Sequence, residues 1–161
     1  MILLGLGANL PSHAGPPQQT LRAALAALER KGIKILSVSS FYETPAWPLP
    51  TDPPFVNAVA AADTGLQPVE LLAVLHGVET DFGRLRSTPN APRTLDLDLL
   101  DHDGRVMEGP VILPHPRLAR RSFVLVPLAE IAPGWRHPVT GEGVRDMLAR
   151  LPDRDVPRKL P

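Results

Sequence analysis

The sequence contains no cysteine, so disulfide bridges and thiolate metal sites are excluded. It also has no run of the ~20 apolar residues that a membrane-spanning helix needs. The first residues, Met1 to Gly7, lack the positively charged start and the cleavage site of a secretory signal. These absences predict a cytoplasmic protein with no membrane partner.

An excess of charge of one sign is missing as well, because 17 Asp and Glu residues balance 17 Lys and Arg residues. A net charge of zero gives no reason to expect a nucleic acid partner. The basic residues are unevenly placed, however, with 4 in residues 1–83 and 13 in residues 84–161, and nearly all of the excess is arginine. The planar guanidinium group suits phosphate oxygens, so the second half of the chain is the better candidate for a phosphate site.

Hydrophobic periodicity and Pro or Gly boundaries predict the order strand, helix, strand, strand, helix, strand. The expected strands are residues 2–6, 33–42, 55–62 and 94–100, and the expected helices are residues 16–32 and 68–83. This is the βαββαβ core of a ferredoxin-like α+β sandwich, with a mainly antiparallel sheet and both helices on one face. The length suits one domain, 1–161. Residues 101–161 are expected to be a C-terminal extension covering the sheet, with a turn at 101–104 and helical pieces near 117–121 and 144–151.

Asp96 and Asp98 are the strongest candidates for chemistry. Leucines at 95, 97 and 99 alternate with them, so both carboxylates project from the opposite face of the predicted strand, roughly 7 Å apart between Cα atoms. Two carboxylates this close repel each other unless a cation lies beside them. Mg²⁺ takes oxygen ligands and completes its shell with water and substrate phosphates, so the pair predicts a site for two Mg²⁺ ions.

An Asp-Leu-Asp triplet alone is common on solvated edge strands, so its neighbours decide the interpretation. Arg84, Arg86 and Arg93 precede the pair, and the span 84–95 contains no acid. Guanidinium groups neutralise phosphate oxygens that a metal ion does not reach, so this combination favours phosphate chemistry over a solvated surface.

A second basic segment follows the predicted strand. His115 stands between two prolines, and arginines occupy positions 117, 120 and 121. This segment is interpreted as a second phosphate-binding wall, against the alternative of a solvated basic helix face. Glu79, near the end of the second expected helix, faces either the same cleft or solvent.

Taken in order, these segments resemble the 6-hydroxymethyl-7,8-dihydropterin pyrophosphokinases of folate biosynthesis. The resemblance spans about residues 2–150 and is carried above all by Pro92-Arg93-Thr94-Leu95-Asp96-Leu97-Asp98. Further matching motifs are residues 5–10, 40–45, 55–58, 84–86, 114–116 and 121–123. The resemblance implies the ferredoxin-like fold and the transfer of diphosphate from ATP to 6-hydroxymethyl-7,8-dihydropterin, which gives AMP and the pterin diphosphate.

The resemblance also implies roles for single residues. Asp96 and Asp98 match the Mg²⁺ ligands and, together with Arg84 and Arg93, the catalytic group. The positions that contact ATP match His76, Glu79, Arg84, Arg86, Arg93, the backbone at Leu99, His115 and Arg121. The pterin pocket matches Thr44, Pro45, Trp47, Phe55, Asn57, Asp96 and Phe123, and aromatic faces with an amide suit a flat, hydrogen-bonding heterocycle. Residues 84–92 are implied to form a mobile lid.

Two other functions are compatible with the residues. A Mg²⁺-dependent nucleotide phosphohydrolase would use the same acids and arginines, although no Nudix-type glutamate helix is present. A non-enzymatic ferredoxin-like domain that binds RNA or a small ligand would need stacking aromatics on its sheet, and 4 Phe, 1 Tyr and 2 Trp offer few. We expect a monomer rather than an oligomer.

Overall fold

The structure, a computed structural model, describes residues 1–46, 48–85, 90–152 and 156–161. Its strands are β1 (Ile2–Ala8), β2 (Lys34–Val38), β3 (Tyr42–Thr44), β4 (Phe55–Asp63), β5 (Asp96–His102) and β6 (Arg158–Lys159). Its helices are α1 (Pro17–Arg30), α2 (Pro68–Asp81), the short 3-10 helix η1 (Leu118–Arg120), α3 (Ser122–Ile131) and α4 (Val144–Ala149). The result is a mixed α/β fold built on an antiparallel sheet.

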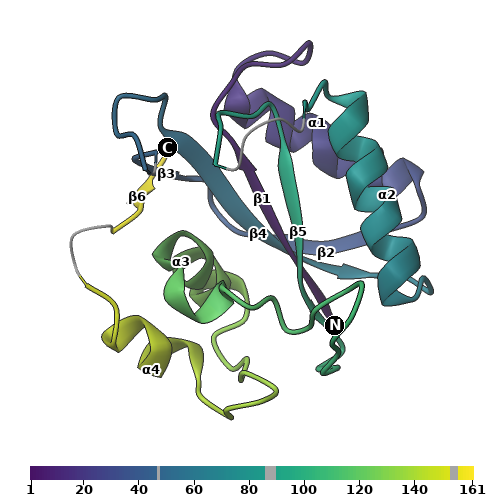
Figure 1. Cartoon of the computed structure of the whole chain (residues 1–161), viewed down its shortest axis with the longest axis vertical. Helices are drawn as coiled ribbons and strands as arrows, with labels where there is room; N and C mark the ends of the chain where they lie inside the picture. Colours follow the sequence, from purple (N-terminus) through teal and green to yellow (C-terminus); the bar gives the residue numbers. More distant parts are fainter. Residues whose placement is uncertain (47, 86–89, 153–155) are drawn as a thin grey trace.

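The sheet follows the order β5-β1-β4-β3-β6, and β2 pairs with another part of β4. β1 lies between β4 and β5 and is antiparallel to both (Figure 1). The long strand β4 is therefore shared by β2 at one end and β3 at the other. This order places β5, which carries Asp96 and Asp98, at one end of the sheet.

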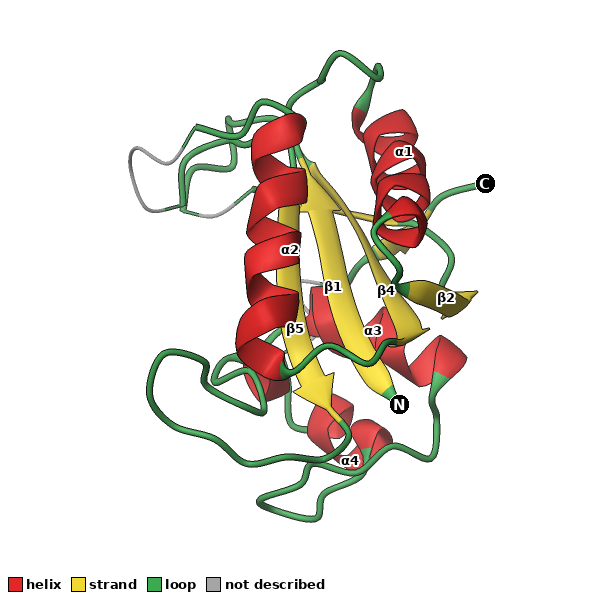
Figure 2. Cartoon of the chain, turned by 90° about the vertical axis from the view of Figure 1, so that its right-hand side faces the viewer, coloured by secondary structure: helices red, strands yellow, loops and turns green. Residues whose placement is uncertain are grey.

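Helices cover both faces of the sheet, with α1 and α2 on one side and α3 on the other (Figure 2). The first core lies under α1 and α2 and takes alternate residues of the strands, such as Leu4, Ala60 and Leu97. The second core lies under α3 and α4 and takes the residues between, such as Leu3 and Val59. The C-terminal extension supplies α3 and α4 and thus covers the second face of the sheet, as the sequence predicted.

The expected helix boundaries are confirmed by the backbone. A proline occupies the first helical turn of both α1 and α2, where its missing N–H costs no hydrogen bond. Gly32 and Gly83 follow the two helices with φ of 86° and 82°, a region that glycine enters without steric penalty.

The single strand predicted over residues 33–42 is wrong, because the structure divides it into β2 and β3. Ser39 lies between the two strands, and its hydroxyl accepts the Val59 N–H at 3.0 Å in place of a backbone carbonyl. The Ser39 N–H still donates to Val59 O at 2.9 Å. Where the strand is interrupted, the Ser39 side chain thus takes the place of a backbone carbonyl in the hydrogen-bond ladder with β4.

Two further differences concern the second half of the chain. β5 starts at Asp96 and continues to His102 through a β-bulge opposite Leu3 and Leu4, so the turn predicted at 101–104 falls at Asp103 and Gly104. Helix α3 was not expected at all. It contains Pro127 and is strongly apolar, so it lacks the alternation of polar and apolar residues that reveals a surface helix.

Among the described residues, no helix is both long and apolar enough to cross a lipid bilayer.

Candidate active site

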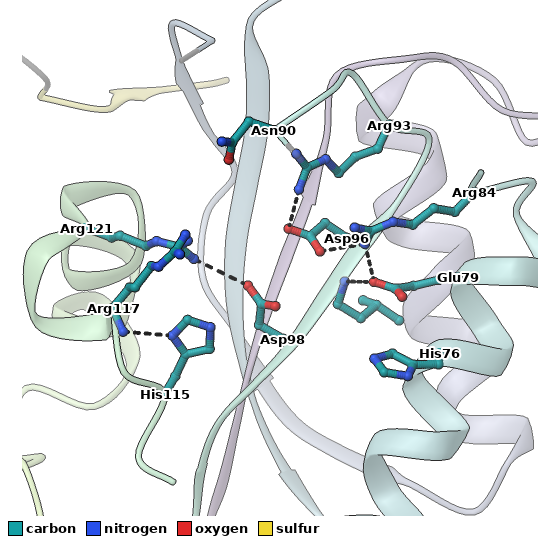
Figure 3. Close-up of a pocket in the computed structure, with 11 residues that line it drawn as sticks. His76, Glu79, Arg84, Asn90, Arg93, Asp96, Asp98, His115, Arg117 and Arg121 are labelled. Carbon is teal, nitrogen blue, oxygen red and sulfur yellow. Dashed lines mark hydrogen bonds and ion pairs between the residues drawn. The ribbon is translucent and has the colours of Figure 1, made fainter. Parts of the chain in front are cut away.

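A single cavity of about 210 Å³ brings together most of the predicted phosphate-binding residues (Figure 3). Its walls come from α2, from β5 and the residues just before it, and from the segment that leads into α3. The lining residues are His76, Glu79, Arg84, Asn90, Arg93, Asp96, Leu97, Asp98, His115, Arg117 and Arg121. Apart from Asn90 and Leu97, the lining therefore consists of acids, arginines and histidines.

Both strand acids face this cavity, and arginines contact each of them. Asp96 Oδ1 lies 2.7 Å from Arg84 Nη1, and Asp96 Oδ2 lies 3.4 Å from Arg93 Nη1. Asp98 Oδ2 lies 3.7 Å from Arg121 Nη1 on the opposite wall. The side chains of Asp96 and Asp98 are 25% and 29% exposed, so both stay accessible from the cavity.

The two acids are not equivalent. Burial, followed by the negative charge of Asp96, raises the pKa of Asp98 to about 7, although Arg121 opposes the shift. Burial and the neighbouring carboxylate therefore outweigh the opposite effect of Arg121 on the pKa of Asp98. A cation beside Asp98 would favour the ionised form of this carboxyl group.

Glu79 connects α2 to β5. Its side chain is almost fully buried, and its Oε2 accepts the Leu97 N–H at 2.7 Å. The same oxygen lies 2.6 Å from Arg84 Nη1. Arg84 is consequently held between Glu79 and Asp96, with its guanidinium group at the cavity wall. Of the two orientations that the sequence left open for Glu79, the structure shows the one that faces the cleft rather than solvent.

His115 lies across the cavity on the segment before η1. Its backbone N–H donates to Leu100 O at 2.9 Å, which ties this segment to the bulge of β5. Burial and the positive charges of Arg121 and Arg117 lower the pKa of His115 to about 4, against a weaker opposite effect of Asp96. The Arg117 N–H donates to His115 Nδ1 at 3.1 Å, so the neutral ring carries its proton on Nε2. Nε2 is then a hydrogen-bond donor.

Two of the residues expected to bind the pterin, Phe55 and Phe123, lie next to arginines of the cavity. Asn57 Nδ2 donates to Thr44 Oγ1 at 3.0 Å, which fixes the orientation of the Asn57 amide. The guanidinium carbon of Arg93 lies 5.5 Å from the centre of the Phe55 ring. That of Arg121 lies 5.3 Å from the centre of the Phe123 ring. Phe55 and Phe123 are both half-buried, so part of each ring stays accessible.

Some predicted residues are placed differently or lie outside this description. Trp47 and Arg86 are outside the described residues, as are residues 87–89 of the implied lid. The Leu99 side chain packs in the core under α1 and α2, so only its backbone is available to a ligand. Pro45 is exposed at the end of β3. Arg117 lines the cavity as part of the basic segment interpreted as a phosphate-binding wall, although the resemblance gave it no role of its own.

The donor set fits a hard cation that a substrate helps to bind. Within the ranges that the structure describes, no group of three or more His, Asp or Glu side chains could enclose a metal ion alone. Mg²⁺ is commonly held by one or two carboxylates together with substrate phosphates and water. Asp96 and Asp98 supply such a pair, and both carboxylates line the cavity.

Comparisons with known proteins give matches over most of the chain. The family model described as 7,8-dihydro-6-hydroxymethylpterin-pyrophosphokinase matches residues 3–133. The 2-amino-4-hydroxy-6-hydroxymethyldihydropteridine pyrophosphokinase of Methylorubrum extorquens is 39% identical and covers 96% of each chain. The folic acid synthesis protein fol1 of Pneumocystis carinii is 34% identical over 99% of this chain, which spans only 21% of that longer protein.

A solved structure shows the same fold. The HPPK-DHPS triple mutant of Plasmodium falciparum superposes with a TM-score of 0.71 at 14% identity. The match covers 92% of this chain and 42% of that one, so this chain spans less than half of its length.

Proposed function

This chain belongs to the 7,8-dihydro-6-hydroxymethylpterin-pyrophosphokinase family, and we propose that the cavity between α2, β5 and α3 is where it transfers diphosphate from ATP to 6-hydroxymethyl-7,8-dihydropterin. The products are AMP and the pterin diphosphate used in folate synthesis. The observation that carries the placement is the meeting, in one cavity, of two strand acids and the three arginines that contact them.

We propose that Asp96 and Asp98 hold two Mg²⁺ ions together with the triphosphate of ATP. When bound, the ions would neutralise phosphate charge and orient the phosphates for in-line displacement. The distribution of the acids supports this, because both carboxylates come from the same face of β5 and open onto the same cavity. In the absence of a metal, Asp96 is neutralised by Arg84 and Arg93 instead.

The arginines are then the groups that bind the phosphates. Arg84 and Arg93 approach from one wall and Arg121 from the other, so a phosphate between them meets guanidinium donors from two directions. Such charge-assisted hydrogen bonds stabilise the charge that develops on the transferred group. The Nε2–H of His115 adds a neutral donor from the same wall as Arg121. Positioning and charge stabilisation supply most of the acceleration in phosphoryl transfer.

The pterin is placed beside the arginine walls. We propose that the rings of Phe55 and Phe123 stack against it, since each lies next to an arginine of the cavity. Asn57, held by Thr44, would then read the hydrogen-bonding edge of the heterocycle. In this placement the hydroxymethyl oxygen points toward the phosphates held at Asp96.

The finer features of the fold are proposals of the same kind. The order β5-β1-β4, with β2 and β3 both following on β4, supports a ferredoxin-like core. We also propose one domain over 1–161, a monomer, a cytoplasmic location and no nucleic acid partner.

Product analysis tests the function directly. The protein is incubated with ATP and Mg²⁺, with and without 6-hydroxymethyl-7,8-dihydropterin, and the nucleotide products are separated. AMP that forms only when the pterin is present supports diphosphate transfer. ADP, or AMP formed without the pterin, would identify a phosphohydrolase instead. Turnover that is unchanged by Asp98→Ala would move the reaction away from the proposed cavity.

A further inference from the structure

Asn9 is a buried side chain between the two halves of the proposed site, although it does not line the cavity. It follows β1 directly and is only 3% exposed. Its amide lies between two segments far from it in the sequence. One is the segment that carries Arg93, and the other is the segment that leads through Pro53 to Phe55.

On one side, Asn9 binds the main chain of Arg93 through its side-chain oxygen and its backbone N–H. Asn9 Oδ1 accepts the Arg93 N–H at 2.8 Å. The backbone N–H groups of Asn9 and Leu10 both donate to Arg93 O at 3.1 Å. The backbone N–H and C=O of Arg93 are thus both hydrogen-bonded to the segment that follows β1. Because both groups are engaged, the Arg93 backbone has little freedom to shift relative to β1.

On the other side, Asn9 Nδ2 donates to Pro53 O at 3.0 Å. Pro53 stands two residues before Phe55, the first residue of β4. One amide therefore uses its acceptor on the phosphate side and its donor on the pterin side. To bind both segments, a side chain of this length needs a hydrogen-bond donor and an acceptor. Aspartate has the same shape, but its carboxylate has no donor.

The Arg93 side chain shows why this connection matters. Its Nη1 lies 3.4 Å from Asp96 Oδ2, and its guanidinium carbon lies 5.5 Å from the centre of the Phe55 ring. Arg93 thus contacts both the proposed metal ligand and the proposed pterin-stacking ring. A change in its backbone position relative to Phe55 changes the spacing of the two substrates.

We propose that Asn9 is a positioning residue that sets the distance between the nucleotide and pterin subsites by holding Arg93 against Pro53. The inference rests on the proposed function. Its physical basis is that in-line transfer is steep in distance, since a misplacement of about 1 Å is sufficient to cost about a hundredfold in rate. Asn9 does not line the cavity, so its loss should affect the ternary complex more than either binary complex.

The variant that separates the two contacts is Asn9→Asp. The carboxylate still accepts the Arg93 N–H, but it faces Pro53 O with a second acceptor instead of a donor. The matched control is Trp135→Phe, which also removes one buried hydrogen bond, from Trp135 Nε1 to Asp101 Oδ2 at 3.0 Å, outside the cavity. Asn9→Ser, which puts no charge near Pro53, replaces Asn9→Asp if that variant does not fold.

The measurements are kcat, the KM of each substrate, and the affinity for the pterin with and without Mg²⁺ and an unreactive ATP analogue. For Asn9→Asp we expect kcat to fall by about tenfold to a hundredfold. We also expect the gain in pterin affinity caused by the nucleotide to fall by about fivefold or more. The affinity for the analogue alone should change by less than about twofold. Trp135→Phe should keep the wild-type kcat and the wild-type gain in pterin affinity caused by the nucleotide.

A folded Asn9 variant would overturn the inference if its kcat, and the gain in pterin affinity caused by the nucleotide, were those of the wild type. So would a variant with a lower melting temperature and no other change, because a purely structural role predicts that pattern. Failure of the proposed function looks different, since the wild-type protein itself would then form no pterin-dependent AMP.

Discussion

The amide oxygen of Asn57 occupies the space that a side chain on Gly7 would need. The two residues are partners in the β1–β4 ladder, and a β-carbon at Gly7 would lie 2.8 Å from Asn57 Oδ1. Real β-carbons essentially never approach another heavy atom this closely. Glycine at this position is therefore required by the orientation of the Asn57 amide rather than by the backbone.

Gly7→Ala should consequently weaken pterin binding. The alanine methyl group would displace the Asn57 amide from Thr44 Oγ1, and we expect the KM for the pterin to rise by about tenfold, or about 1.4 kcal/mol. The KM for ATP should stay near the wild-type value. Gly5→Ala is the matched control, because its β-carbon meets Leu100 and Asp98 only at ordinary distances of 3.5 to 3.6 Å. Equal effects of the two substitutions would contradict the role given to Gly7.

Asp98→Ala should abolish Mg²⁺-dependent turnover in a folded protein. We expect a loss of about a thousandfold or more in kcat, because a proposed metal ligand is removed without a replacement. Pterin-dependent AMP formation measures the loss, and circular dichroism verifies the fold. The control is Asp103→Ala, which removes an exposed ion pair with the N-terminus and should keep full activity.

The stability of the metal-free protein should carry two opposite proton linkages between about pH 4 and pH 6.5. Folded Asp98 binds a proton that the unfolded chain has released, since its pKa rises from 3.8 to about 7. Folded His115 lacks a proton that the unfolded chain binds, since its pKa falls from 6.5 to about 4. The first lowers stability as the pH rises and the second increases it, so the two largely cancel.

Asp98→Asn removes the first linkage and should reveal the second. Relative to the wild type, the free energy of unfolding of Asp98→Asn should rise with pH by up to about 1 kcal/mol per pH unit between pH 4 and pH 6.5. Above pH 7 the variant should be more stable than the wild type, because it avoids burying a charged carboxylate beside Asp96. Urea titrations at several pH values measure this, and parallel curves for the two proteins would contradict it.

Arg84→Ala should destabilise the protein more than the loss of a surface ion pair. Arg84 is 14% exposed and lies between Glu79 and Asp96, so its removal takes a cation away from a buried acid. Breaking such a pair costs about 3–5 kcal/mol. Arg158→Ala is the matched control, because its contact with Glu43 is exposed and should be worth less than about 1 kcal/mol. Similar unfolding free energies for both variants would show that Arg84 is not held as described.

The only tyrosine of the sequence provides an optical probe of the contact between α3 and the sheet. Tyr42 Oη donates to Glu130 Oε1 at 2.7 Å, and Glu130 Oε2 accepts the Ser40 N–H at 2.5 Å. Burial, then the hydrogen bond and charge of Glu130, raise the pKa of Tyr42 to about 12. This stabilisation is present below pH 10 and is lost as the pH rises toward 12.

Glu130→Gln should lower the Tyr42 pKa, which stays above 10 because burial is the larger cause. Absorbance of tyrosinate measures the titration while circular dichroism follows the fold. Glu142→Gln alters an ion pair with Arg150 elsewhere and should leave the curve unchanged. A folded wild-type protein that titrates near pH 10 would contradict the contact.

Much of the fold follows from local patterns in the sequence. The alternation of Leu95, Leu97 and Leu99 with the two aspartates predicted which face of β5 is buried, and the structure confirms it. Proline and glycine marked both ends of α1 and α2. Helix α3 escaped prediction because it is apolar on most sides and contains Pro127, so no 3.6-residue period distinguishes it from a buried strand.

The sequence by itself therefore determined the order of most elements, the face on which Asp96 and Asp98 lie, and the basic character of the segments around them. These properties repeat every two to four residues, so local chemistry is sufficient to specify them. The tertiary structure alone decided that Arg84 lies between Glu79 and Asp96, that His115 is neutral, and that Asn9 joins Arg93 to Pro53. Such contacts depend on how separate segments pack in three dimensions, and Asn9 and Arg93 stand 84 positions apart.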